Sequence, residues 1–188
     1  KPNEFPFGVA PDFMNAQLNV LWADAPGTIL PDTTYYAEDN DKGKELLATW
    51  RQMQEELLAK FDFSAEEIKD LLNKTIELDA KLAKYILSRE ESSEYVKLYH
   101  PYDWADFTKL APDLPLDSIF TQILGEIPDK VIVPEERFWK EFAAEYYSEK
   151  NWELLKADLI VSAATSYNSY LTDEIRVLSG TYSRALSG

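Results

Sequence analysis

The chain has 188 residues, 45% of them apolar and 13% aromatic, which suits one packed globular domain and argues against intrinsic disorder. Its 34 acidic and 19 basic residues give a formal charge of −15, which would repel a phosphate backbone and argues against nucleic acid as a partner. Cysteine is absent, so neither disulfides nor thiolate chemistry are available.

The start of the sequence and its hydropathy predict a piece of a longer polypeptide without a membrane span. No apolar run approaches the ~20 residues that a bilayer span requires. The start at Lys1-Pro2-Asn3 lacks both a signal-peptide pattern and an initiator methionine. We therefore expect an excised fragment with no membrane-spanning segment.

Residues 17–36 predict a strand that then turns back into the fold. Their first part alternates between apolar and other side chains, which is the period of a half-buried strand. Pro26 and Gly27 give a turn signal that should end this strand. We expect a small β-hairpin within residues 5–36 and helices over residues 41–188.

Two long helices are predicted next. Asn40 or Asp41 can cap a helix over about 42–61. Its expected apolar stripe comprises Leu46, Trp50, Met53, Leu57 and Phe61. A capping box at Ser64 begins a second helix, which the apolar pattern extends to about Ser88.

Asp79 is the one acid whose direction the helical period determines. At 100° per residue it falls near the middle of the apolar stripe of the second helix, between Leu72 and Ile86. An inward carboxylate must be paired or hydrogen-bonded, because an unpaired buried charge costs several kcal/mol or shifts its pKa. We therefore interpret Asp79 as a structural buried acid, held by an arginine or by backbone amides.

The middle of the chain predicts shorter elements. Residues 90–97 are polar and are expected to form a loop or a frayed helix end. Asp103 can cap a short helix, and Pro115 opens another that Gly125 ends. The β-branched run 130–133 predicts a buried strand or an extended segment.

Pro134, Ser148 and Thr172 should begin or cap three further helices. The expected buried faces of these helices are, in order, Phe138, Trp139, Phe142 and Tyr146; Trp152, Leu155, Leu159, Ile160, Ala163 and Tyr167; and Ile175, Leu178, Tyr182 and Leu186. The predicted fold is a mainly α-helical, multi-helix domain with a small N-terminal β-hairpin.

Several short motifs, spread in order over nearly the whole chain, resemble one known family. They are Phe7-Gly8-Val9, Leu30-Pro31 followed by Tyr35-Tyr36, Asp79-Ala80-Lys81-Leu82-Ala83, Val131-Ile132-Val133, and Arg184-Ala185-Leu186-Ser187-Gly188. Their order and spacing resemble the non-catalytic N-terminal part of the neprilysin-type zinc metallopeptidases, most of all the bacterial oligoendopeptidase O. The resemblance gives Leu30, Pro31, Tyr35 and Tyr36 a structural role as family-motif residues.

The chain departs from the family pattern in three respects. Asp79 stands where the family usually has a glutamate, so its side chain has a shorter reach. His100 stands where the family usually has an asparagine. The chain also lacks the cysteines of the disulfide-rich mammalian members.

The resemblance implies a parent that hydrolyses oligopeptides with zinc. Such a peptidase needs His-Glu-x-x-His on one helix, whereas this chain has a single histidine, His100. We therefore expect no catalytic and no metal-binding residue in the fragment, and a zinc site beyond Gly188. His100 alone could act as a base or a ligand, and the simpler interpretation is a structural or surface role.

The resemblance further implies that the fragment forms a helical lobe gating substrate access to the catalytic cavity. Its expected partners are the C-terminal zinc lobe of the same polypeptide and the parent's peptide substrates, and the isolated fragment could self-associate. The expected compartment is the bacterial cytoplasm. The alternative is an independent acidic helical module that binds or scaffolds another protein, and a His-Glu-x-x-His motif downstream of this chain would favour the peptidase.

Overall fold

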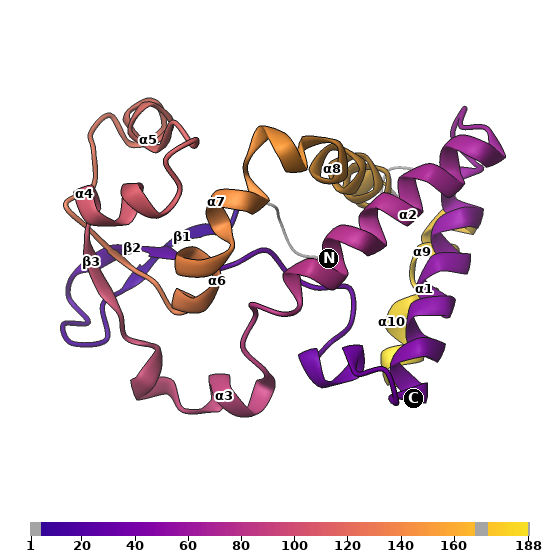
Figure 1. The fold of residues 1–188 in the computed structure, drawn as a ribbon, viewed down its shortest axis with the longest axis horizontal. Helices are drawn as coiled ribbons and strands as arrows, with labels where there is room; N and C mark the ends of the chain where they lie inside the picture. Colours follow the sequence, from indigo (N-terminus) through magenta and orange to yellow (C-terminus); the bar gives the residue numbers. More distant parts are fainter. Residues whose placement is uncertain (1–4, 168–172, 188) are drawn as a thin grey trace. The chain divides into compact units, whose positions relative to one another are not determined.

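The computed structural model describes residues 5–167 and 173–187, and the chain divides into two compact units. The first unit comprises Thr28–Lys84 and Trp152–Gly188, and the second comprises Pro2–Gly27 and Tyr85–Asn151. Most of the described elements are helices, and a four-stranded sheet lies in the second unit (Figure 1). The predicted mainly α-helical class with a small N-terminal β-hairpin is therefore confirmed.

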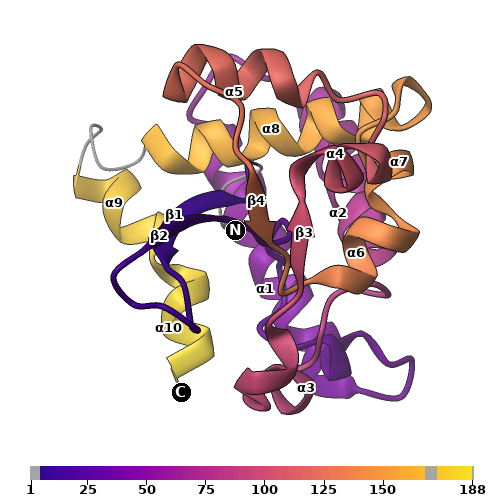
Figure 2. The ribbon, with the colours of Figure 1, turned by 90° about the vertical axis from the view of Figure 1, so that its left-hand side faces the viewer.

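The sheet of the second unit is built on the predicted hairpin. β1 (Phe7–Pro11) pairs antiparallel with β2 (Asn19–Ala23), and β2 pairs in parallel with β4 (Lys130–Ile132). β3 (Pro101–Asp103) adds antiparallel to β4, so the strand order is β1-β2-β4-β3 (Figure 2). β4 confirms the strand predicted from the β-branched run. β3 was not predicted, because three residues that begin with proline give no alternating pattern.

Short helices of the second unit contribute to an aromatic core. They are α3 (Arg89–Ser93), α4 (Trp104–Phe107), α5 (Leu116–Leu124), α6 (Glu136–Glu141) and α7 (Ala143–Tyr146), with 3-10 turns at Tyr95–Leu98, Thr108–Leu110 and Glu149–Asn151. The ring of Trp139 lies 5.5 Å from that of Phe7 and 4.7 Å from that of Phe107, between centroids. Its indole N–H donates to the carbonyl of Asp24 at 2.7 Å. Phe7 and Asp24 thereby join the hairpin to the helices.

One predicted boundary in this unit is wrong, and one segment is more regular than expected. Residues 90–97, predicted as a loop or a frayed helix end, contain most of the short helix α3, because Ser88 and Glu91 form a capping box at its start. α6 begins at Glu136 rather than at Pro134, since the intervening Glu135 has a non-helical backbone. The predicted buried face of α6 and α7 is confirmed, and it comprises Phe138, Trp139, Phe142 and Tyr146.

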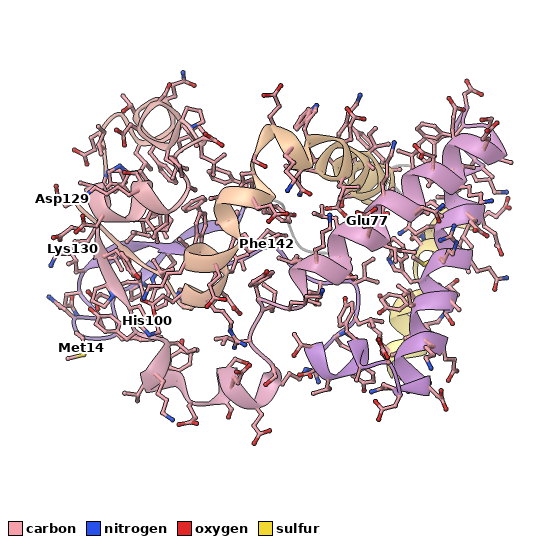
Figure 3. The ribbon with its side chains drawn as sticks, viewed as in Figure 1. Met14, Glu77, His100, Asp129, Lys130 and Phe142 are labelled. Carbon is pink, nitrogen blue, oxygen red and sulfur yellow. The ribbon has the colours of Figure 1, made fainter. Side chains whose placement is uncertain are left out.

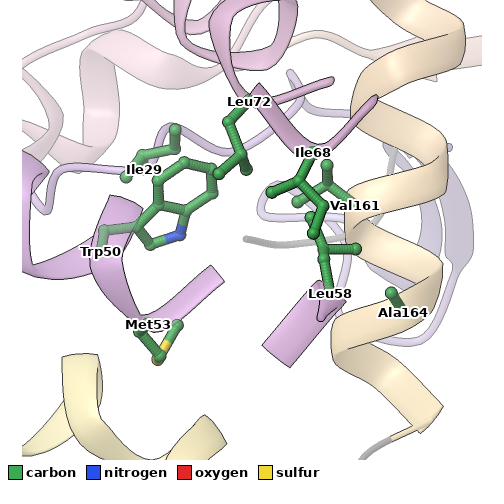
Figure 4. Packing of buried hydrophobic residues seen from close by; sticks show 8 residues of the cluster. All are labelled: Ile29, Trp50, Met53, Leu58, Ile68, Leu72, Val161 and Ala164. Atoms are coloured by element: carbon green, nitrogen blue, oxygen red, sulfur yellow. The ribbon is translucent and has the colours of Figure 1, made fainter. Parts of the chain in front are cut away.

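The first unit packs longer helices around an aliphatic core. These helices are α1 (Asp41–Leu58), α2 (Ala65–Leu82), α8 (Trp152–Ser166), α9 (Asp173–Ser179) and α10 (Thr181–Ser187), with a 3-10 turn at Thr33–Tyr36. α2 packs along α8, and α1 packs against α9 and α10. Buried side chains from several of these elements meet in one cluster (Figure 4): Ile29, Trp50, Met53, Leu58, Ile68, Leu72, Val161 and Ala164.

The second long helix begins where the capping box predicts and ends earlier than predicted. α2 ends at Leu82 rather than at about Ser88. After Lys84 the chain belongs to the second unit, where the ring of Tyr85 stacks on that of Phe142 with centroids 4.6 Å apart. Tertiary contacts there override the helical pattern of the sequence. α1 likewise ends before its predicted limit.

The prediction for α8 chose the wrong face. Trp152, Leu159 and Tyr167 are exposed, although the apolar period placed them inside. The residues that α8 buries are Leu155, Ala157, Asp158, Val161 and Ala164. Apolar residues occur around most of this helix, so their period does not select one face. The last predicted helix is interrupted at Gly180, and its predicted cap, Thr172, lies outside the described residues.

Gly43, in the first turn of α1, has no room for a side chain. A Cβ there would lie 1.9 Å from the carbonyl oxygen of Tyr35, and only a backbone movement could relieve that contact. We expect Gly43→Ala to lower the free energy of unfolding by roughly 2–4 kcal/mol, because overpacking against backbone strains both elements. Urea denaturation followed by circular dichroism measures this change.

Gly8→Ala is the matched control for this variant. A Cβ at Gly8 would meet no heavy atom within 4 Å, so the substitution should be neutral or slightly stabilising. Equal unfolding midpoints for the two glycine variants would contradict the prediction.

Candidate functional site

Asp79 lies on α2 and points into the interior of the first unit, where it is 1% exposed. Its Oδ1 accepts a hydrogen bond from the backbone N–H of Ile29 at 2.8 Å. Its Oδ2 accepts a short hydrogen bond from the hydroxyl of Tyr36. The partners of this carboxylate thus include one backbone amide and one phenol, both from the segment that precedes α1.

The same segment receives further hydrogen bonds from side chains. The oxygen of Tyr36 accepts from the N–H of Leu30 at 3.0 Å, and the hydroxyl of Thr28 donates to the carbonyl of Leu30 at 2.8 Å. The hydroxyl of Tyr182, on α10, donates to the carbonyl of Ile29 at 2.7 Å. Residues 28–30 are therefore bonded to groups from α2, from the 3-10 turn and from α10.

The electrostatics of this network keep both tyrosines protonated. Burial, and then the charge of Asp79, raise the pKa of Tyr36 far above its ordinary value. The same two causes raise the pKa of Tyr182 to about 12. Both hydroxyls therefore remain donors throughout the physiological pH range. This arrangement can clamp a backbone segment, because both hydroxyls stay available as donors.

The other family-motif residues lie in the same segment. Leu30 is buried, whereas Pro31 and Tyr35 are partly buried. The carbonyl of Tyr35 faces Gly43 of α1 at the close approach described above. Asp32 caps the 3-10 turn, since its Oδ1 accepts from the N–H of Thr34 at 2.9 Å. The structure thus brings Leu30, Tyr36 and Asp79 together in one network.

His100 belongs to the second unit and directly precedes β3 in the sequence (Figure 3). Its Nδ1 is 3.2 Å from the carbonyl oxygen of Val133, and its Nε2 is 3.5 Å from Oε2 of Glu136. Glu136 also accepts from the hydroxyl of Tyr102 at 2.5 Å and pairs with Lys140 at 2.8 Å. Burial opposes the charge of Glu136, but hydrogen bonds from Lys140 and Tyr102 outweigh it and lower the pKa of this carboxyl. His100 therefore belongs to a partly exposed polar cluster.

The described part of the chain holds no group of three or more histidine, cysteine, aspartate or glutamate side chains that could bind a metal ion. His100 has one carboxylate beside it, which is fewer ligands than a zinc site needs. The described helices are also too short or too polar to cross a membrane.

Comparison with known sequences identifies the family of this chain. The profile described as Peptidase family M13, in its N-terminal part, matches residues 1–188. The chain belongs to peptidase family M13. A Streptococcus gordonii protein, named as a candidate zinc metalloproteinase in the scaA 5′ region, is 65% identical over all of this chain and 33% of its own length. The neutral endopeptidase of Lactococcus lactis subsp. cremoris is 36% identical over 99% of this chain and 29% of its own length.

Solved structures of two other proteins share the fold. PepO from Lactobacillus rhamnosis HN001 matches with a TM-score of 0.86 and 25% identity, over 98% of this chain and 30% of that one. A zinc metalloprotease of Mycobacterium tuberculosis, in its open state, matches in fold with a TM-score of 0.76 and 16% identity, over 97% of this chain and 29% of that one. This chain therefore spans about a third of the length of the relatives that it matches.

Glu135 is a partly buried acid that the sequence analysis did not identify. It lies between β4 and α6, and its Oε2 accepts from the N–H of Leu87 at 3.1 Å. Burial raises the pKa of Glu135 to about 7, and the nearby charge of Asp24 adds to the rise. An acid after Pro134 is equally typical of an exposed first helical turn, so the sequence carried no signal of this burial.

Removing the carboxylate of Asp79 should destabilise the first unit. Asp79→Ala leaves the amide of Ile29 and the hydroxyl of Tyr36 without this acceptor, which should cost on the order of 3 kcal/mol of unfolding free energy. Asp79→Asn should cost less, because an amide oxygen can still accept from Ile29. Urea denaturation of both variants, beside the exposed Glu66→Ala, measures the difference.

Tyr36→Phe tests the coupling in the same network. Asp79→Asn and Tyr36→Phe should be non-additive by roughly 1–2 kcal/mol in a double-mutant cycle, because each removes one partner of the same hydrogen bond. Additive effects, or an Asp79→Ala midpoint equal to that of Glu66→Ala, would show that the network does not hold the segment.

The raised pKa of Glu135 should make stability depend on pH. The folded chain holds this proton with a pKa near 7 and the unfolded chain with the ordinary value of about 4.5, so the folded state binds more protons between them. This contribution to the free energy of unfolding is complete below about pH 4.5 and is lost as the pH rises through 7. Its size should be roughly 3 kcal/mol, because each unit of pKa difference corresponds to about 1.4 kcal/mol.

Glu135→Gln should remove this pH dependence, since a glutamine can still accept from Leu87 and does not titrate. The measurement is the difference in unfolding free energy between wild type and variant across the pH range, with the exposed Glu90→Gln as control. Parallel curves for wild type and Glu135→Gln would refute the assignment.

Proposed function

We propose that the polypeptide containing this chain is a zinc metalloendopeptidase that hydrolyses oligopeptides, and that this chain forms its helical lobe. One observation carries the proposal: the N-terminal family M13 profile covers all of residues 1–188, while the relatives are about three times as long. Those relatives are named as a zinc metalloproteinase and as neutral endopeptidases. The lobe would gate access to the catalytic cavity and limit the size of the substrate.

The chemistry would reside in the remaining two-thirds of the polypeptide. A zincin needs two histidines one helical turn apart with a glutamate between them, and a further acidic ligand. This chain has one histidine, so zinc would bind to the C-terminal part, which is the proposed partner of this lobe. The proposed compartment is the bacterial cytoplasm.

Exposed apolar side chains support packing against another lobe. Ile123, Leu124 and Ile127 lie close together in the sequence around the end of α5, and each is about half exposed. Side chains of this kind usually lie at contact surfaces when they are grouped. We propose that they pack on the rest of the polypeptide, and that the isolated chain self-associates when they are uncovered. An independent scaffold module is less well supported, because the family match extends over the whole chain.

The isolated chain should bind no zinc tightly and cleave no peptide. Elemental analysis after purification should find less than stoichiometric zinc, and a bradykinin-sized peptide should stay intact, because one histidine cannot form a catalytic zinc site. The polypeptide continued to the length of its relatives should contain His-Glu-x-x-His, bind zinc and cleave the same peptide. Absence of that motif from the continued reading frame would overturn the proposed function.

A further inference from the structure

One face of the β1–β2 hairpin borders a large hollow in the second unit. The hollow measures about 710 Å³, and its lining is mostly apolar, with Gly8, Ala10 and Trp22 from the hairpin and Phe13, Tyr95 and Leu98 beside them. Gly8 pairs with Trp22 across the hairpin, so both lie on the same face. A Cβ at Gly8 would meet no atom within 4 Å, which agrees with open space above this strand.

The hollow reaches the outer edge of the sheet, where β1 has unused hydrogen-bonding groups. Asp24 donates to Pro6, and Asp12 donates to Leu18, so the alternating ladder directs residues 6, 8, 10 and 12 toward β2. The N–H and C=O of Phe7 and Val9 therefore point away from β2. Within residues 5–167 and 173–187, β1 is the last strand on its side of the sheet. Val9 is 62% exposed.

The charges around the hollow are of one sign. Among the described residues its lining includes Asp12 and Asp24 and no lysine or arginine. Asp12 lies two residues after Ala10, and Asp24 lies two residues after Trp22. Because successive side chains of a strand point to opposite faces, both carboxylates lie on the face that borders the hollow, at opposite ends of the hairpin. Asp24 also adds negative charge near Glu135, as described above. A cationic group at this end of the hollow would offset that repulsion.

We propose that the free edge of β1 and the adjoining hollow bind an extended peptide of another molecule, as an added strand with alternating apolar residues flanked by basic residues. Backbone hydrogen bonds to Val9 and Phe7 would hold the strand, and every second side chain would enter the hollow. The two aspartates would each take one basic side chain. Six strand residues separate the two ends, which is about 20 Å.

Charge disfavours a second copy of this chain at the same edge. Each copy carries a formal charge of −15, and pairing two β1 strands would bring Asp12 and Asp24 of both copies together. A basic peptide meets no such repulsion. The binding needs neither zinc nor cleavage, so its test is separate from that of the proposed peptidase function.

The probe is the capped heptapeptide acetyl-Arg-Thr-Val-Thr-Val-Thr-Arg-amide, whose arginines and valines lie on one face of a strand. We expect it to shift the amide resonance of Val9 and the indole N–H resonance of Trp22 in the NMR spectrum of the isotope-labelled chain. Replacing both arginines by glutamates should weaken binding at least about thirtyfold, since two attractions become repulsions. Equal binding of the two peptides would overturn the proposal.

Two variants at one position isolate the strand pairing. The N–H of Val9 points outward, so Val9→Pro removes this donor and leaves the bonds to β2 intact. Val9→Ala removes the exposed isopropyl group and keeps the N–H, so it reports what the valine side chain alone contributes. Val9→Pro should bind the probe about tenfold more weakly than Val9→Ala, with both variants folded by circular dichroism. Equal affinities would exclude an added strand.

Two further variants test the hollow and the charge. Gly8→Phe should place a ring in the part of the hollow next to β1 and abolish probe binding, with circular dichroism showing that the variant is folded. Asp24→Asn should lower the affinity for the arginine-flanked peptide about threefold to tenfold. The affinity for a glutamine-flanked peptide should not change. Unaltered binding by Gly8→Phe would place the peptide elsewhere and overturn the proposal.

A last measurement separates a foreign peptide from the rest of the same polypeptide. The probe should also bind the polypeptide continued to the length of its relatives. If it binds only the 188-residue chain, the edge is covered from within and the proposal is wrong. Concentration-dependent dimerisation that the probe reverses would likewise favour a second copy and overturn it.

Discussion

The carboxylate of Asp79 joins parts of the first unit that are far apart in the sequence. It accepts from the amide of Ile29, 50 positions earlier, and from the hydroxyl of Tyr36, which in turn accepts from Leu30. Residues 28–30 lie in neither a helix nor a strand, so their backbone groups need partners from elsewhere. Asp79 on α2 provides an acceptor for the amide of Ile29 and for the hydroxyl of Tyr36. The segment that these bonds hold leads into α1, where the carbonyl of Tyr35 lies close to Gly43.

The sequence predicted the position of this acid, while its partners came only from the structure. The helical period alone placed Asp79 on the inner face of α2, because apolar neighbours recur regularly around it. Nothing local could indicate that Tyr182, 153 positions from Ile29, would complete the network. The buried face of α8 was predicted wrongly for a similar reason. Apolar residues occur on most sides of this helix, so their period does not indicate which face is buried. The limit of local sequence also explains the early end of α2, which contacts made by Tyr85 in the second unit determine.

The two units use acidic residues in opposite ways. In the first unit, hydrogen-bond donors surround Asp79, so its negative charge is an acceptor that organises the backbone. In the second unit, burial and the charge of Asp24 raise the pKa of Glu135 to about 7. The ionised form of this carboxyl is therefore disfavoured, and its effect on stability depends on pH. A sequence with 34 acids gives no sign of this contrast, because residue type alone does not report the donors around a carboxylate.

The hairpin shows how one set of charges can both protect an edge strand and select what pairs with it. An uncovered edge invites another strand, and natural sheets discourage this with proline and charge. β1 ends in Pro11, which Asp12 follows. The side chain of Phe7, at the start of β1, packs in the aromatic core. The carboxylates that repel a second acidic copy attract a basic chain by the same Coulomb interaction. Gly8 and Ala10 leave space beside the edge that larger residues would fill. The charge at this edge therefore disfavours pairing with a second copy of the chain and favours pairing with a basic strand.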